Sequence, residues 1–121
     1  MKHITPAELA RWQENGHDFE LLDVRRAGVR SNHGAEIAGG RWLDPAAWLE
    51  WKDSIGITEP VVMYCAKGHE ISQALATALT VLGADACYLT GGMQGWLEEG
   101  RPVQPLDWKK APFDTFFDKN K

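Results

Sequence analysis

The sequence has few cysteines, no excess of basic residues and no long apolar run. Its two cysteines, Cys65 and Cys87, are too few for the disulfide framework that holds many small secreted domains together. A net charge of −4 disfavours the phosphate backbone of nucleic acids, which normally requires a basic protein face. We therefore expect free thiols and no nucleic-acid partner.

No apolar segment approaches the roughly 20 residues needed to cross a bilayer, so we expect no membrane partner. The N-terminus reaches Pro6 and Glu8 without the apolar core of a signal peptide. These features indicate a cytoplasmic protein. In that reducing compartment a free cysteine is either a buried packing residue or a reactive thiol, so the two cysteines are interpreted separately below.

What is present fits one ordinary globular domain, since the chain is 44% hydrophobic and 25% charged and has no repeat or low-complexity segment. We expect a single domain over residues 1–121. Its core should span about residues 5–102, followed by an extended tail at residues 103–121. The tail carries aromatic residues expected to pack on the body, namely Trp108, Phe113, Phe116 and Phe117.

The beginning of the chain predicts a helix and then a strand. Thr5 and Glu8 form a capping box around a proline at the first helical position, and together these residues mark a helix start. The helix is predicted to end at Asn15-Gly16. Residues 19–24 then form a short apolar run that suits a buried strand.

The middle of the chain predicts a loop, a helix and the strongest strand. Residues 25–40 are expected to be mostly loop, because glycines and alanines accumulate near their end. Asp44-Pro45 repeats the cap-and-proline signal and predicts a helix. This helix carries Trp48, Leu49 and Ile55. Residues 61–64 are apolar without alternation, which indicates burial on both faces, as in a parallel sheet.

The last part of the core predicts two helices and one strand. Residues 71–82 predict a helix ended by Gly83, because apolar residues recur there at helical spacing. These apolar positions are Ile71, Ala74, Leu75, Ala78, Leu79 and Leu82. Residues 86–89 predict a short strand, and a turn of two glycines then leads into a helix around Trp96 and Leu97.

This alternation of strands and helices predicts an α/β fold, an open, mostly parallel sheet with helices on both faces. In such sheets ligands bind beyond the carboxyl ends of the strands. Cys65 directly follows the buried strand at residues 61–64, so it lies at that edge. Cys87 lies inside the predicted strand at residues 86–89, where filling the core is the favoured interpretation.

The segment after Cys65 favours a reactive thiolate. A segment of five residues separates Cys65 from the predicted helix. A tight turn that contains glycine can point its backbone N–H groups inward, where they can bind an anion. The positive end of the helix dipole adds to this field. Both effects favour the thiolate over the thiol, and an accessible thiolate is a nucleophile.

Four segments resemble characteristic segments of the rhodanese family and occur in the family's order. Residues 64–73 resemble its active-site loop, and residues 22–25 resemble its aspartate-valine-arginine strand end. Residues 36–40 are similar to its histidine-isoleucine-proline-glycine-alanine turn, with three of the five positions changed. Residues 89–96 resemble its double-glycine-to-tryptophan ending, and the similarity extends over about residues 5–102.

The resemblance implies a rhodanese-like fold and a sulfurtransferase that needs no cofactor. It implies that Cys65 attacks the outer sulfur of a donor and carries that sulfur as a persulfide. The expected substrate-binding residues are Ala66, Lys67, Gly68, His69, Glu70 and Ile71. Asp23 and Arg25 are expected to form a structural ion pair. The expected partners are a small sulfur-containing anion or thiol and, for some acceptors, a protein.

The loop departs from the family at two positions. Glu70 and Ile71 stand where many rhodaneses have an arginine followed by a serine or threonine. Glu70 repels an anionic donor, whereas Lys67 and His69 supply replacement positive charge, so the physiological donor need not be thiosulfate. The run from Gly68 to Gln73 also resembles a rhodanese branch associated with chromate resistance.

Two other function classes remain open. A cysteine phosphatase or arsenate reductase needs an arginine that grips a tetrahedral oxyanion, but the sequence has none between Arg41 and Arg101. A non-catalytic binding or regulatory module is compatible with Glu70. Cys65 and His69 are too few ligands for a zinc site, so we expect no metal.

Overall fold

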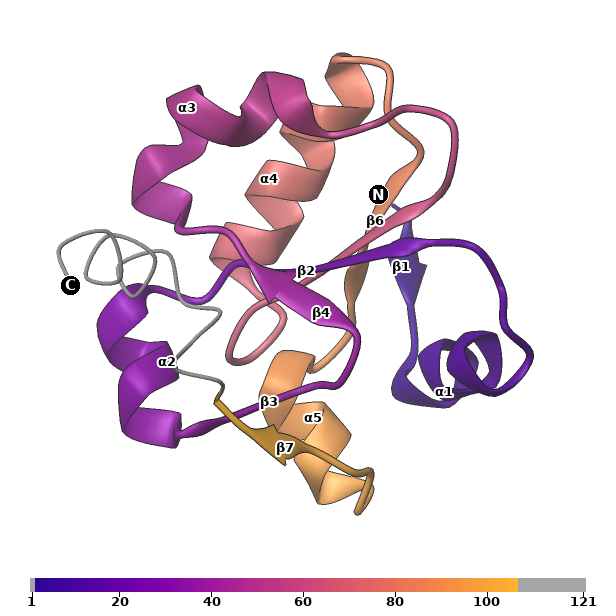
Figure 1. The fold of residues 1–121 in the computed structure, drawn as a ribbon, viewed down its shortest axis with the longest axis vertical. Helices are drawn as coiled ribbons and strands as arrows, with labels where there is room; N and C mark the ends of the chain where they lie inside the picture. The colour runs from indigo at the N-terminus through magenta and orange to yellow at the C-terminus, as the bar shows by residue number, and fades with distance from the viewer. Residues whose placement is uncertain (1, 107–121) are drawn as a thin grey trace, which may run out of the picture.

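The structure is a computed structural model that describes residues 2–106. Five parallel strands form its central sheet, which confirms the predicted fold class (Figure 1). In their order across the sheet the strands are β1 (His3–Ile4), β6 (Ala86–Leu89), β5 (Val61–Tyr64), β2 (Glu20–Asp23) and β4 (Gly40–Trp42). Because every pairing is parallel, the carboxyl ends of all five strands share one edge.

Helices cover both faces of the sheet (Figure 1). The helices are α1 (Pro6–Glu14), α2 (Ala27–His33), α3 (Trp48–Trp51), α4 (Glu70–Val81) and α5 (Gly92–Glu98). Successive residues of β5 alternate between two hydrophobic clusters. Val61 and Met63 pack with α3 and α4, whereas Val62 and Tyr64 pack with α1 and α5. Among the described residues, no helix has the length and apolarity to span a bilayer.

The cap predicted for the first helix is present. Thr5 Oγ1 accepts a hydrogen bond from the Glu8 backbone amide at 3.2 Å, and Glu8 Oε1 accepts one from the Thr5 backbone amide at 3.0 Å. This reciprocal pair satisfies two donors at a helix end that would otherwise lack partners. The helix ends with Asn15 as its C-cap, as predicted.

The prediction that residues 25–40 are mostly loop is wrong. The segment contains α2 and the short strand β3 (Ala35–Glu36), and β3 pairs antiparallel with β7 (Gln104–Pro105) near the end of the described chain. Helix α2 has no apolar periodicity, and its Arg30 is held in the interior by ion pairs instead. The aromatic residues of the predicted tail lie outside the described residues.

The predicted helix after Asp44 is divided into three short pieces. A 3₁₀ turn at Pro45–Ala47, α3, and a second 3₁₀ turn at Lys52–Ser54 follow one another. The Asp44 side chain caps the first piece by accepting from the Ala46 amide at 2.9 Å. Leu49 is largely exposed, so Trp51 and Ile55 provide the buried contacts of this segment.

Helix α4 buries the predicted set of apolar residues only in part: Leu79 is buried, and Ile71 and Leu75 are half-buried against the core. Ser72, Ala76 and Leu79 are buried, whereas Ala74 and Leu82 are exposed. Alanines on both sides of the helix made the apolar stripe broad, so the spacing alone did not show which edge faces the sheet. The buried line begins at Ser72, which is the part of α4 nearest Cys65.

This burial predicts opposite outcomes for two leucines of the same segment. Leu79 is 1% exposed and Leu82 is 49% exposed. Leu79→Ala should lower the free energy of unfolding by about 2–4 kcal/mol because it leaves a cavity in the core. Leu82→Ala should cost less than about 1 kcal/mol. Urea unfolding of both variants measures the difference, and equal losses would contradict this orientation of α4.

Candidate active site

Cys65 lies where the fold predicts a ligand site, directly after β5 and between the ends of β6 and β2. Its side chain is only 6% exposed. The Sγ atom is 3.1 Å from Oγ of the fully buried Ser72, within hydrogen-bonding distance. Sequence reasoning did not single out Ser72. The available signal was that Ser72 lies in the first turn of the helix after the loop, so it can face back toward the strand end.

The backbone carbonyls of the Cys65 loop, residues 65–69, are tied to neighbouring helices. The carbonyl oxygens of Cys65 and Ala66 accept hydrogen bonds from the backbone amides of Met93 and Gln94, each at 2.9 Å. The Gly68 carbonyl accepts one from the Gln73 side chain at 2.9 Å. These contacts fix the loop between the start of α5 and the first turn of α4.

The backbone N–H groups of this loop and of the first residues of α4 have no protein acceptor among the described residues. Within residues 2–106, none of the backbone amides from Ala66 to Ile71 donates a hydrogen bond to a protein acceptor. A run of unpaired N–H groups leading into a helix start is an arrangement that binds anions. The loop can therefore stabilise negative charge near Cys65 Sγ.

Two glycines allow the loop to approach the turn before α5. Gly68 has φ +72°, and a Cβ there would lie 2.7 Å from the Gly91 backbone nitrogen. Gly92 has φ +56°, and its Cβ would overlap the Cys65 carbonyl oxygen. Any larger residue at either position would separate the two backbones. The double glycine therefore holds the Cys65 loop in place.

Cys65 opens into a cavity of about 330 Å³. Its walls are Arg25, Arg26, Val29, Cys65, Ala66, Lys67, His69, Glu70 and Ile71. The structure thus gathers the predicted substrate-binding residues around one cavity, except Gly68, which packs against the turn before α5. Arg26 was missed by sequence reasoning. Because it follows β2, the neighbour of β5 in a parallel sheet, both segments open at the same edge.

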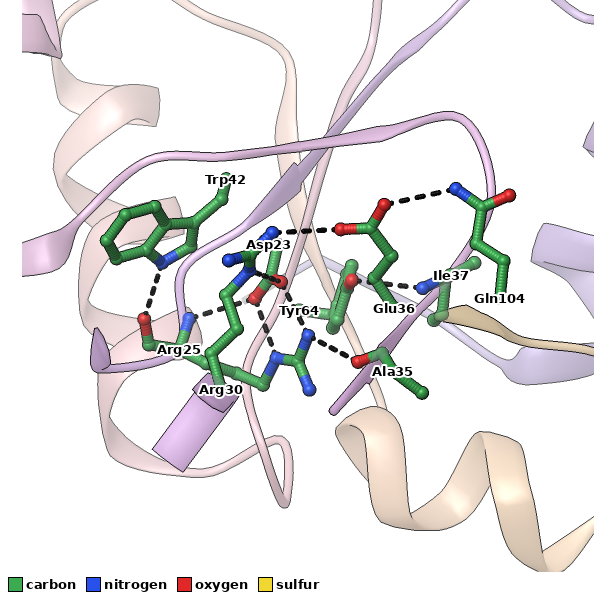
Figure 2. Close-up of polar contacts among 9 residues, drawn as sticks. All are labelled: Asp23, Arg25, Arg30, Ala35, Glu36, Ile37, Trp42, Tyr64 and Gln104. Carbon is green, nitrogen blue, oxygen red and sulfur yellow. Dashed lines mark hydrogen bonds and ion pairs between the residues drawn. The ribbon is translucent and has the colours of Figure 1, made fainter. Parts of the chain in front are cut away.

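A buried ion cluster supports the far wall of this cavity (Figure 2). The Asp23 carboxylate accepts from Arg25 Nε at 2.9 Å, from Arg25 Nη2 at 2.7 Å and from Arg30 Nε at 3.3 Å. Arg30 Nη2 donates to Glu36 at 2.9 Å. Two cations and two anions balance here, as buried charges require.

The cluster keeps Arg25 charged and ties three segments together. Burial alone would lower the pKa of Arg25, but the hydrogen bonds and charge of Asp23 outweigh burial and raise it above its ordinary value. The Arg25 side chain also donates a hydrogen bond to the Ala35 backbone carbonyl at 2.9 Å. The backbone carbonyl of Arg25 accepts a hydrogen bond from Trp42 Nε1 at 2.9 Å. The cluster thereby fixes the start of α2, which carries wall residues of the cavity.

Cys87 occupies a different environment from Cys65. It lies in β6 opposite Val62 and packs in the hydrophobic cluster of α1 and α5, whereas Cys65 packs in the cluster of α3 and α4. Burial raises the pKa of the Cys87 thiol to about 11, so this thiol stays protonated near neutral pH. Among residues 2–106, no three histidine, cysteine or acidic side chains are grouped so that they could hold a metal ion.

The close approach at Gly92 predicts a selective loss of stability. Gly92→Ala adds a backbone clash to the strain of a positive φ, so it should lower the free energy of unfolding by at least about 2 kcal/mol. Gly100 has φ +69° and nothing within 4 Å of an added Cβ, so Gly100→Ala should cost only about 1 kcal/mol. Urea unfolding compares them, and equal costs would show that the loop does not depend on this contact.

The fold matches several solved structures. A rhodanese-related protein from Thermoplasma volcanium superposes with a TM-score of 0.72 at 27% identity, covering 85% of this chain and 97% of that one. A rhodanese-like domain protein from Staphylococcus aureus gives a TM-score of 0.75 at 23% identity, covering 88% and 100%. A thiosulfate sulfurtransferase from Pseudomonas aeruginosa gives 0.70 at 22% identity, covering 86% of this chain and 19% of that one.

Two comparisons of the sequence with known proteins give different results. No curated protein matches the chain. Residues 5–99, however, match the sequence model of the family described as the rhodanese-like domain. That match spans four of the five strands of the central sheet, all except β1, together with the Cys65 loop and the double-glycine turn. The chain therefore belongs to the rhodanese-like domain family.

Proposed function

We propose that this protein is a sulfurtransferase that carries sulfane sulfur as a persulfide on Cys65. The observation that carries the proposal is the run of unpaired backbone N–H groups from Ala66 to Ile71 beside the Cys65 cavity. A thiolate and a persulfide are both anions, and fixed amide dipoles stabilise both without reorganising. Membership of the rhodanese-like family supports the proposal.

The reaction proceeds by two displacements at sulfur. With thiosulfate as donor, the Cys65 thiolate attacks the outer sulfur and forms a new S–S bond. The bond between the outer sulfur and the sulfonate sulfur breaks, and sulfite leaves with the electron pair. A thiophilic acceptor such as cyanide then attacks the terminal sulfur of the persulfide. Thiocyanate leaves, and the Cys65 thiolate is restored.

Different residues around the cavity would stabilise the thiolate and attract the donor. The Ser72 hydroxyl, 3.1 Å from Sγ, donates a hydrogen bond to the thiolate. Lys67 and Arg26 attract an anionic donor, whereas Glu70 opposes them, and all three side chains are exposed at the cavity. We propose a small sulfur-containing anion or thiol as substrate, a thiol or protein as acceptor, and the cytoplasm as location.

The cysteine assignment predicts unequal effects of two conservative substitutions. Cys65→Ser should lower sulfur transfer from thiosulfate to cyanide at least about a thousandfold, because it removes the nucleophile. Cys87→Ser should leave most of the rate, because Cys87 lies on the other face of the sheet with a protonated thiol. Thiocyanate formation and the gain of one sulfur atom by mass measure both steps. A wild-type chain that never gains sulfur would instead indicate a binding or regulatory module.

The charge at Glu70 predicts a salt-dependent gain. Glu70→Gln should raise kcat/KM for thiosulfate about twofold to fivefold at low salt, and the gain should shrink near 1 M salt, where charges are screened within about 3 Å. The matched control is Glu59→Gln, which removes an exposed carboxylate near the opposite end of β5. Equal effects of the two substitutions would mean that only net charge matters.

A further inference from the structure

A second cavity of about 410 Å³ lies between α2 and α5, beside the Cys65 cavity. The two cavities have four wall residues in common, namely Arg25, Val29, Ala66 and Lys67. The remaining walls of the second cavity come from the end of α2 and from α5. Whatever occupies the second cavity therefore also narrows the approach to Cys65.

The cavity between α2 and α5 has two large aliphatic side chains that the described residues do not cover. Val29 of α2 is 45% exposed and Leu97 of α5 is 38% exposed, and both line the cavity together with the buried Met93. A single exposed aliphatic residue is ordinary on a protein surface, but several gathered in one hollow indicate a place where another group binds. The cavity therefore requires an apolar occupant.

The described chain ends beside this cavity. Strand β7 pairs antiparallel with β3 directly after α2 (Figure 1), and the Leu106 backbone amide donates to the Gly34 carbonyl at 3.2 Å. Gly34 is the C-cap of α2 and follows His33, which lines the cavity. The path to this point is fixed, because Trp96 Nε1 also donates to the Pro102 carbonyl at 2.8 Å. Residue 107 therefore starts at the rim of the cavity.

The C-terminal segment, residues 107–121, is rich in aromatic side chains. Its aromatic residues are Trp108, Phe113, Phe116 and Phe117, so it holds three of the four phenylalanines of the chain. Aromatic side chains bury the most apolar area per residue. A fully extended chain would carry Phe117 about 35 Å from Leu106, so every one of these side chains can reach the cavity.

The charges of the cavity rim and of the segment are compatible. Lys67 and Glu98 are exposed at the cavity and have opposite signs. The segment also carries both signs, with two lysines directly after Trp108 and an aspartate on each side of the phenylalanine pair at residues 116–117. An aromatic side chain of this segment can therefore enter the cavity while its charged neighbours stay at the rim.

We infer that the C-terminal segment occupies the cavity between α2 and α5 and controls access to Cys65. Its aromatic side chains cover Val29 and Leu97 and form an outer wall of the entrance to the Cys65 cavity. Because the segment is linked to the domain at Leu106, its effective concentration at the cavity is about millimolar, and a weak contact suffices to fill the cavity most of the time. This inference does not depend on sulfur transfer.

The test measures access to Cys65 in the full-length chain. The rates at which N-phenylmaleimide and iodoacetamide label Cys65 are followed by mass, and the ratio of the two rates reports the room for a bulky reagent, because both reagents react with the thiolate. Replacing all four aromatic residues of the segment by serine should raise this ratio at least about threefold, since the cavity is then mostly empty. Cys87 is buried with a raised thiol pKa, so its labelling reports unfolding.

A second substitution tests where the segment binds. Leu97→Asn removes the apolar contact on the cavity side, so it should raise the ratio as much as the serine replacements do. Combining the two changes should add little, because residues in contact have coupled effects. Leu49→Asn is the matched control, since Leu49 is an exposed leucine of α3 outside both cavities. It should leave the ratio unchanged and leave the effect of the serine replacements intact.

Three outcomes would overturn the inference. An unchanged ratio after the serine replacements means that the segment does not cover the entrance. Additive effects of these replacements and Leu97→Asn mean that the segment acts at another place. A ratio that rises on tenfold dilution of the unaltered chain means that a second copy fills the cavity. If the fourfold replacement exposes Cys87 to labelling, the pair Phe116→Ser and Phe117→Ser takes its place, with the same expected direction.

Discussion

The two hydrogen bonds from the start of α5 to the carbonyls of Cys65 and Ala66 determine the orientation of the peptide groups beside Cys65. A peptide group has its carbonyl and its N–H on opposite sides, so fixing the carbonyls toward α5 leaves the neighbouring amides free on the other side. The glycines at positions 68 and 92 permit this contact by letting two backbones touch. The unpaired N–H groups of the loop thus result from how the loop is anchored.

The ion cluster around Asp23 supports the opposite wall by a different physical means. Packing cannot hold α2, because the helix has only seven residues and its one large aliphatic side chain, Val29, is substantially exposed. Paired buried charges hold it instead, and a single carboxylate, that of Asp23, joins two arginines. Removing one member of such a cluster leaves an uncompensated charge in the interior, which typically costs about 3–5 kcal/mol. The geometry of the cavity therefore depends on ion pairs where α2 forms its wall. It depends on backbone contacts with the start of α5 where the Cys65 loop forms its wall.

The sequence was informative where local physics determines structure. The capping box at Thr5 and the unbroken apolar strand at residues 61–64 specify their elements without help from the rest of the chain. The position of Cys65 followed from the rule that parallel strands end at one edge. The gathering of the loop residues around a cavity was likewise foreseeable from the glycine turn and the helix behind it.

What the sequence did not reveal depends on tertiary contacts. Helix α2 has no apolar pattern, because its interior residue is the charged Arg30, whose ion-pair partners Asp23 and Glu36 lie outside the helix. The contact of Ser72 with Cys65 depends on the rotation of α4, and small residues left that rotation undetermined. The position of Arg26 in the cavity wall could not be predicted without the strand order, which places β2 beside β5.

The separation of the two cysteines has a consequence for the redox behaviour of the protein. Cys87 is level with Val62, three residues before Cys65 along the neighbouring strand, which is about 10 Å at the usual rise of a strand. Disulfides need Cα atoms within about 7 Å, and these side chains also pack on opposite faces of the sheet. Since the chain has no other cysteine, a sulfenic acid formed on Cys65 has no internal thiol with which to condense. Reduction of that sulfenic acid would therefore need a thiol from outside the chain, and the cavity of about 330 Å³ at Cys65 is where such a thiol would reach the sulfur.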